Sequence, residues 1–178
     1  MRYLLSYTKH PRRNLPVITS RKRTEADFVF AFGKAFEKDL KDKKGISFKI
    51  AREFSFNGLG IADFICIKWE NGSRGNSFCN KKKLLAFEMK IKDWRKALAQ
   101  AYRYKYFANA VYVVLPPEEI KRAKLALSTF KMLKVGLWSF DKKFIQLKKI
   151  YSPKIGTSLS GPAHKKALEL ISGYLNLR

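Results

Sequence analysis

The chain has 178 residues, 46% of them apolar, which is enough for one domain with a real core. No apolar run reaches the roughly 20 residues that span a bilayer, and the N-terminal apolar stretch is too short for a secretory signal. Two cysteines, Cys66 and Cys79, are too few for a disulfide framework, so we expect a cytoplasmic protein with no membrane partner. A net charge of +24 indicates a polyanionic partner, most often nucleic acid.

Periodicity and turn residues predict ten elements along the chain. In chain order they are a helix (25–40), three strands (46–56, 61–69, 84–90), a helix (94–109), a strand (110–116), a helix (117–133), two short strands (135–140, 143–150) and a helix (164–175). Thr24 is expected to cap the first helix, and Asp93 the second. In the first strand, Ile50 and Phe54 are expected to share one face because their positions have the same parity.

This order predicts an α/β fold. Three sequential strands with short turns suggest an antiparallel meander, and the strand–helix–strand that follows suggests a parallel crossover. We expect a mixed sheet of four to five strands, flanked by helices on both faces. The predicted organisation is a basic N-terminal arm (1–23), a single domain (24–150) and a C-terminal loop and helix (151–178) that packs on the domain or extends it.

Charged residues interrupt the apolar run of residues 84–94 at Glu88 and Lys90, which share one face of the predicted strand. They form either a local ion pair on a solvated face or half of a metal site. Asp63, on the preceding strand, favours the second reading, because carboxylates from neighbouring strands offer the hard oxygen ligands that suit Mg²⁺. Lys90 could then orient or deprotonate the attacking water.

A third carboxylate follows from helical geometry. At about 100° per residue, Glu25 aligns with Val29, Phe32 and Phe36, on the apolar stripe that should face the sheet. The simpler reading is that Glu25 is a first-turn acid that complements the helix dipole.

The Asp…Glu-x-Lys arrangement, with Asp63, Glu88 and Lys90 on consecutive strands, resembles the PD-(D/E)XK nuclease superfamily. The helix–strand–strand–strand–helix–strand order over residues 24–115 is similar to that family's restriction-endonuclease-like core. In the predicted helix downstream, Gln100 and Tyr104 are spaced as in the Gln-x-x-x-Tyr motif of the RecB-like branch, near the Holliday-junction resolvases.

The resemblance implies roles for individual residues. Asp63, Glu88 and the backbone carbonyl of Met89 would bind Mg²⁺ or Mn²⁺, with Glu25, the first-helix acid, as a further metal ligand, and Lys90 would handle the water. Gln100 and Tyr104 would support catalysis, with ordinary helix packing as the alternative. Ala62 replaces the proline that gives the family its name, which is a mild departure.

Together these features predict a Mg²⁺-dependent deoxyribonuclease, more specifically an endonuclease, that hydrolyses DNA in restriction, repair or recombination. The alternatives are a non-catalytic nucleic-acid-binding protein derived from a nuclease fold and a basic structural protein of a ribosome or membrane surface. This interpretation is compatible with a homodimer. The residues expected to contact DNA are basic: Arg21, Lys22, Arg23, Lys92, Arg95 and Arg103.

Overall fold

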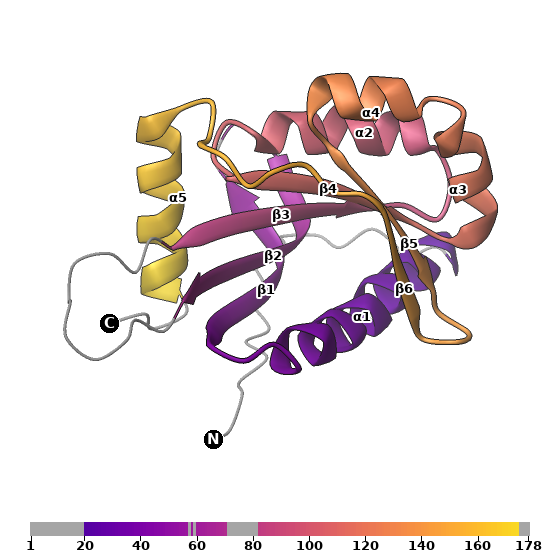
Figure 1. Cartoon of the computed structure of the whole chain (residues 1–178), viewed down its shortest axis with the longest axis horizontal. Helices are drawn as coiled ribbons and strands as arrows, with labels where there is room; N and C mark the ends of the chain where they lie inside the picture. Colours follow the sequence, from indigo (N-terminus) through magenta and orange to yellow (C-terminus); the bar gives the residue numbers. More distant parts are fainter. Residues whose placement is uncertain (1–19, 57, 59, 71–81, 175–178) are drawn as a thin grey trace.

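The structure is a computed structural model that describes residues 20–56, 58, 60–70 and 82–174. Its core is one mixed sheet with the strand order β1-β2-β3-β4-β5-β6, covered by helices (Figure 1). The elements are α1 (Ser20–Lys41), β1 (Ile46–Phe56), β2 (Gly60–Glu70), β3 (Lys83–Met89), α2 (Trp94–Tyr104), β4 (Ala110–Leu115), α3 (Pro117–Lys124), α4 (Leu127–Leu133), β5 (Gly136–Asp141), β6 (Gln146–Tyr151) and α5 (Gly161–Tyr174).

The predicted mixed sheet is confirmed, but its strand count is wrong: six strands form one sheet, rather than four to five. β1, β2 and β3 make an antiparallel meander. β3, β4 and β5 are parallel, and β6 returns antiparallel to β5. The two short C-terminal strands join the sheet because an uncovered edge of β4 would leave a row of backbone groups unpaired.

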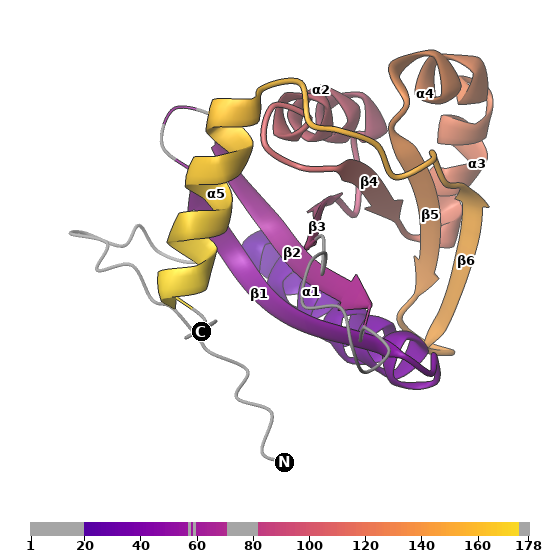
Figure 2. The ribbon, with the colours of Figure 1, turned by 60° about the vertical axis from the view of Figure 1, so that its left-hand side comes forward.

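Helices cover both faces of the sheet, as predicted (Figures 1 and 2). α1 lies on one face and buries Phe28, Phe32, Phe36 and Leu40, which recur every four residues. The ring of Phe32 packs edge-to-face on Phe64 of β2, at 5.5 Å between centroids. The other face carries α2, α3, α4 and α5, whose buried side chains join one apolar core. Within the described residues, no helix is long and apolar enough to span a membrane.

The start of α1 differs from the prediction. The helix begins at Ser20, so Thr24 lies inside it and does not cap it. Arg and Lys are good helix formers, which explains why residues 21–23 add a turn to the helix instead of belonging to the arm. Residues 1–19, the remainder of the predicted arm, lie outside the described residues, as does Cys79; Cys66 is a free, buried thiol.

The face assignment in β1 is also wrong. Ile50 packs in the core beneath α1, whereas Phe54 packs in the core of the opposite face. Between them Glu53 has a φ of 51°, in the left-handed region, and such a residue breaks the alternation of side chains along a strand. Other differences are smaller: α2 ends at Tyr104, and the predicted helix over 117–133 is divided into α3 and α4.

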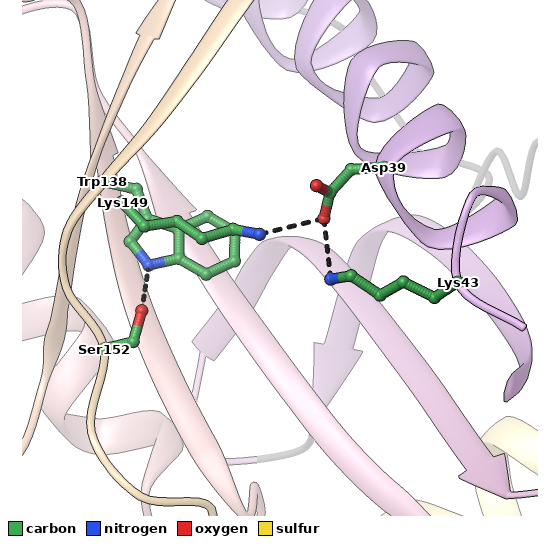
Figure 3. Close-up of polar contacts among 5 residues, drawn as sticks. All are labelled: Asp39, Lys43, Trp138, Lys149 and Ser152. Carbon is green, nitrogen blue, oxygen red and sulfur yellow. Dashed lines mark hydrogen bonds and ion pairs between the residues drawn. The ribbon is translucent and has the colours of Figure 1, made fainter.

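A polar cluster ties the C-terminal half of α1 to the far edge of the sheet (Figure 3). Asp39 Oδ2 accepts hydrogen bonds from Lys149 Nζ on β6 at 3.0 Å and from Lys43 Nζ at 3.1 Å. Nearby, Trp138 Nε1 donates to Ser152 Oγ at 2.8 Å. These contacts help to set the position of α1, the helix that carries Glu25.

Candidate active site

Asp63 and Glu88 come together where β2 and β3 separate. The last paired residues of the two antiparallel strands are Phe64 and Phe87, and one further step of this register places Asp63 opposite Glu88. There the Asp63 side chain takes the place of a backbone acceptor, because its Oδ2 accepts a hydrogen bond from the Met89 N–H at 2.7 Å. The two carboxylates therefore meet at the end of a ladder, as the sequence predicts.

Glu88 is 1% exposed, and its two carboxylate oxygens have different surroundings. Oε2 accepts a hydrogen bond from the Tyr104 hydroxyl at 2.6 Å, while the same hydroxyl lies 2.6 Å from the Ile61 carbonyl oxygen. Oε1 forms an ion pair with Lys90 Nζ at 3.0 Å and has no further partner among the described residues. A carboxylate oxygen has two lone pairs, so Oε1 has one left that could face a cation.

The Tyr104 hydroxyl is shared between two acceptors. The tyrosine has one hydroxyl hydrogen, yet its oxygen lies within hydrogen-bonding distance of Glu88 Oε2 and the Ile61 carbonyl. Its donation to Glu88 stabilises the ionised carboxylate and so lowers the pKa of Glu88, against the effect of burial.

Burial and neighbouring charges together shift the pKa values of Asp63, Glu88 and Lys90. Burial, reinforced by the charge of Glu88, raises the pKa of Asp63 to about 7. Burial also raises the pKa of Glu88, against the opposing effects of Lys90 and Tyr104. For Lys90, burial alone would lower the pKa, but the carboxylates of Asp63 and Glu88 outweigh it and raise the pKa. The three groups therefore titrate as one cluster, in which the single charge of Lys90 does not offset the charges of the two acids.

Glu25 on α1 is half-buried, and its charge acts on the cluster: it raises the pKa of Asp63, Glu88 and Lys90. Since α1 begins at Ser20 and has no acid in its first turn, Glu25 lies in the second turn. The alternative of a first-turn acid that complements the helix dipole is therefore wrong. The structure brings Glu25 within electrostatic range of the site, as the stripe argument predicts.

Gln100 and Met89 add neutral oxygens. The side-chain oxygen of Gln100 is buried and has no hydrogen-bond partner among the described residues, one helical turn from Tyr104. Lys90 N–H donates to β4, at Val114 O, whereas Met89 N–H points toward β2. The N–H and C=O of an extended residue point the same way, so the Met89 carbonyl is also directed to the Asp63 side.

This donor set fits a hard divalent cation. Asp63, Glu88 and the Met89 carbonyl offer oxygen ligands, and Mg²⁺ commonly takes one or two carboxylates and keeps several waters. Within the described part of the chain, no three His, Cys, Asp or Glu side chains lie together as a metal-binding group. A cation here would therefore be held by two carboxylates, with Glu25 acting from a greater distance.

Glu119, a residue that the sequence does not single out, holds α2 behind the site. Glu119 lies on α3, and its buried carboxylate accepts a hydrogen bond from the N–H of Trp94, the first residue of α2, at 3.1 Å. Asp93, the predicted cap, accepts one from the Lys96 N–H at 3.1 Å. Together they anchor the first turn of the helix that carries Tyr104. No local pattern could reveal Glu119, because its partner is 25 residues away.

The residues expected to contact DNA fall into two groups. Lys92, Arg95 and Arg103 are exposed, on or just before α2. The guanidinium of Arg95 lies 4.5 Å from the ring centroid of its neighbour Trp94. The second group, residues 21–23, lies in the first turn of α1, but these side chains are outside what the structure describes.

Comparisons with known proteins add no relative. No family model matches the chain, nor does any curated protein or solved structure. The resemblance to the PD-(D/E)XK nucleases stays a prediction, and it rests on the residues and contacts described above.

Proposed function

We propose that this chain is a metal-dependent deoxyribonuclease that hydrolyses a phosphodiester bond with an activated water. One observation carries the proposal: the buried carboxylate of Glu88 and the partly buried carboxylate of Asp63, both with raised pKa values, meet beside Lys90 at the end of the β2–β3 ladder. A structural ion pair with Lys90 needs only one acid. A second acid that is also partly buried is costly without a cation, in a chain whose net charge of +24 otherwise favours polyanions.

Asp63, Glu88 and the Met89 carbonyl would hold Mg²⁺ or Mn²⁺. When bound, the cation supplies Lewis-acid stabilisation of charge on the phosphate and makes water more acidic. Tyr104 keeps the Glu88 carboxylate in place through its 2.6 Å hydrogen bond. Asp63 is similarly fixed by the Met89 N–H.

Lys90 has a charge state that depends on these acids. In the metal-free protein the raised pKa of Lys90 keeps it an ammonium ion, which can orient a water or a phosphate but cannot accept a proton. If the charges of Asp63 and Glu88 were neutralised, the two largest causes of that increase would be lost, and burial, which lowers the pKa of Lys90, would be opposed only by the weaker effect of Glu25. Lys90 would then be closer to acting as a general base.

A cleavage assay tests the proposal. Linear, circular, single-stranded and four-way-junction DNA are incubated with Mg²⁺ or Mn²⁺ and, in parallel, with a chelator. We expect metal-dependent cleavage, and a rate that falls about 10³-fold or more in Glu88→Gln and Lys90→Ala. Asp42→Asn, an exposed acid beyond the end of α1, is the control and should cut like the wild type. Cleavage that survives in Glu88→Gln would place the active site elsewhere.

A second candidate is a non-catalytic nucleic-acid-binding protein. It is favoured by the direct contacts of Glu88 with Lys90 and Tyr104, which close much of the site without a metal. Such a protein would bind DNA equally well with and without divalent metal and would cut no nucleic acid. Its affinity would be unchanged in Asp63→Asn and Glu88→Gln.

A further inference from the structure

The β5–β6 hairpin ends in an exposed apolar pair. Phe144 is 70% exposed and Ile145 is 57% exposed, and both follow Lys142 and Lys143. We refer to residues 142–145 as the hairpin tip. Exposed Lys148 continues the basic character along β6. None of these residues belongs to the candidate active site or to the surface of α2.

The hairpin tip has a defined and costly conformation. Asp141 Oδ1 accepts hydrogen bonds from the N–H groups of Lys143 and Phe144, at 2.8 and 3.2 Å, which pins the turn. Ile145 has a φ of 53°, although a β-branched side chain strongly disfavours the left-handed region. Gly or Asn would make the same turn at lower cost. An apolar side chain therefore occupies a position where both the backbone and the solvent disfavour it.

The tip lies at the same end of the sheet as the candidate active site. β3, β4 and β5 are parallel, and their register aligns Met89 with Val114 and Trp138. Two strand spacings and the three residues from Trp138 to Asp141 place the base of the tip about 14 Å from Met89. Figures 1 and 2 show the closed end of the hairpin beside α1, where Lys142 Nζ lies 3.8 Å from Asp27 Oδ2.

The chemistry of the tip matches a DNA duplex. Its lysines suit phosphates, of which each strand carries one per about 3.4 Å of helix axis, so 14 Å along the axis corresponds to about four base pairs. Apolar side chains on basic proteins can enter between base pairs from the minor groove and partly unstack them. Lys143 Nζ lies 5.3 Å from the centroid of the Phe144 ring, so a positive charge and an apolar side chain lie next to each other at the tip. A lipid surface would take the same charges, but two apolar side chains offer it little area to bury.

We propose that the hairpin tip binds the DNA duplex at a distance of about four or more base pairs from the phosphate at Asp63 and Glu88. Phe144 and Ile145 pack against or between base pairs there, and Lys142 and Lys143 contact the flanking phosphates. This inference rests on the proposed function, because it identifies double-stranded DNA as the form of substrate that the site receives.

The test compares two pairs of exposed apolar residues. Phe144→Ser/Ile145→Asn alters the tip, and the matched control Leu125→Ser/Met132→Ser alters side chains that are 89% and 74% exposed elsewhere. Affinity for a labelled 30-base-pair duplex is measured by fluorescence anisotropy in chelator, so that no DNA is cut. We expect about a 10-fold loss for the tip variant and less than a twofold change for the control. A duplex scanned with 2-aminopurine should brighten with the wild type but not with the tip variant.

The outcomes separate the two proposals. Asn tolerates the conformation of Ile145, so the tip variant should melt no lower than the wild type, and each single variant is measured as a check on folding. Equal affinity of the tip variant and the wild type for the duplex would overturn the hairpin inference, even if the protein cuts DNA. Loss of binding to anionic lipid vesicles, with duplex binding unchanged, would overturn it in favour of a membrane. Tip-dependent binding without any cleavage would support the contact between the tip and the duplex, but it would reject the nuclease and with it the position of the tip relative to a phosphate at Asp63 and Glu88.

Discussion

Neutralising Asp63 should stabilise the metal-free protein, although it removes a residue of the candidate active site. Burial and the charge of Glu88 raise the pKa of Asp63 from 3.8 to about 7. The native state therefore binds a proton that the unfolded chain releases, and stability falls as the pH rises from about 4 to about 7. Above pH 7 the native protein bears the full cost of an ionised, partly buried Asp63 beside Glu88.

The size of the effect follows from the pKa difference. About three pKa units correspond to about 4 kcal/mol at most, at about 1.4 kcal/mol per unit. We expect Asp63→Asn to recover about half of this, about 2 kcal/mol at pH 8.5, because the amide is still a polar group that must be buried. The Asn oxygen can still accept the hydrogen bond from the Met89 N–H. At pH 4.5, where native Asp63 is already neutral, the gain should shrink to about 0.5 kcal/mol.

Urea denaturation in chelator at the two pH values measures this difference. A gain of 2 kcal/mol corresponds to an increase of about 4–8 °C in Tm for a chain of this size. Asp42→Asn is the control, and as an exposed substitution it should change stability by less than about 0.5 kcal/mol at either pH. A variant that is less stable than the wild type at pH 8.5, or equally stabilised at both pH values, would refute the argument. With Mg²⁺ present, the wild type should be more stable than Asp63→Asn, because only the wild type keeps both carboxylate ligands.

Three further predictions concern the surroundings of the site and the charge of the chain. Tyr104→Phe leaves Glu88 Oε2 and the Ile61 carbonyl without their shared donor, so we expect a loss of about 1–3 kcal/mol in urea denaturation; an unchanged stability would show that the hydroxyl contacts do not matter. Asp39→Asn breaks the bridge to Lys149, whose hydrogen bond lowers the pKa of Asp39 against the opposing effect of burial. Because the Asp39 side chain is only partly buried, the cost should be under about 1 kcal/mol at pH 7. It should disappear as the pH falls from 3.8 through the lowered pKa of native Asp39, below which the carboxyl is protonated in both states; a cost that persists in stronger acid would contradict this. Finally, DNA affinity should fall steeply between 50 and 200 mM salt, by about 10³-fold if about six phosphates are contacted, and a flat dependence would reject a polyanionic partner.

The sequence alone was sufficient for features that depend on neighbours along the chain. The side-chain period of two in a strand places Glu88 and Lys90 on one face, and in the structure Glu88 Oε1 lies 3.0 Å from Lys90 Nζ. The helical period places Glu25 on the stripe of α1 that faces the sheet. Asp93 caps α2 because capping joins residues three positions apart. Short apolar runs separated by turn residues identified all six strands, although not their membership of one sheet.

Only the tertiary structure decides how the site is held and charged. The hydroxyl of Tyr104 reaches Glu88 because α2 packs across the end of β3, and Glu119 reaches Trp94 from a different helix. Burial of Asp63 depends on every element packed around it, and so does its pKa. Glu53 also shows the limit of periodicity, since its left-handed backbone moves Phe54 to the other face. Hydrogen bonds and desolvation act between groups that are close in space, whereas periodicity records only groups that are close in sequence.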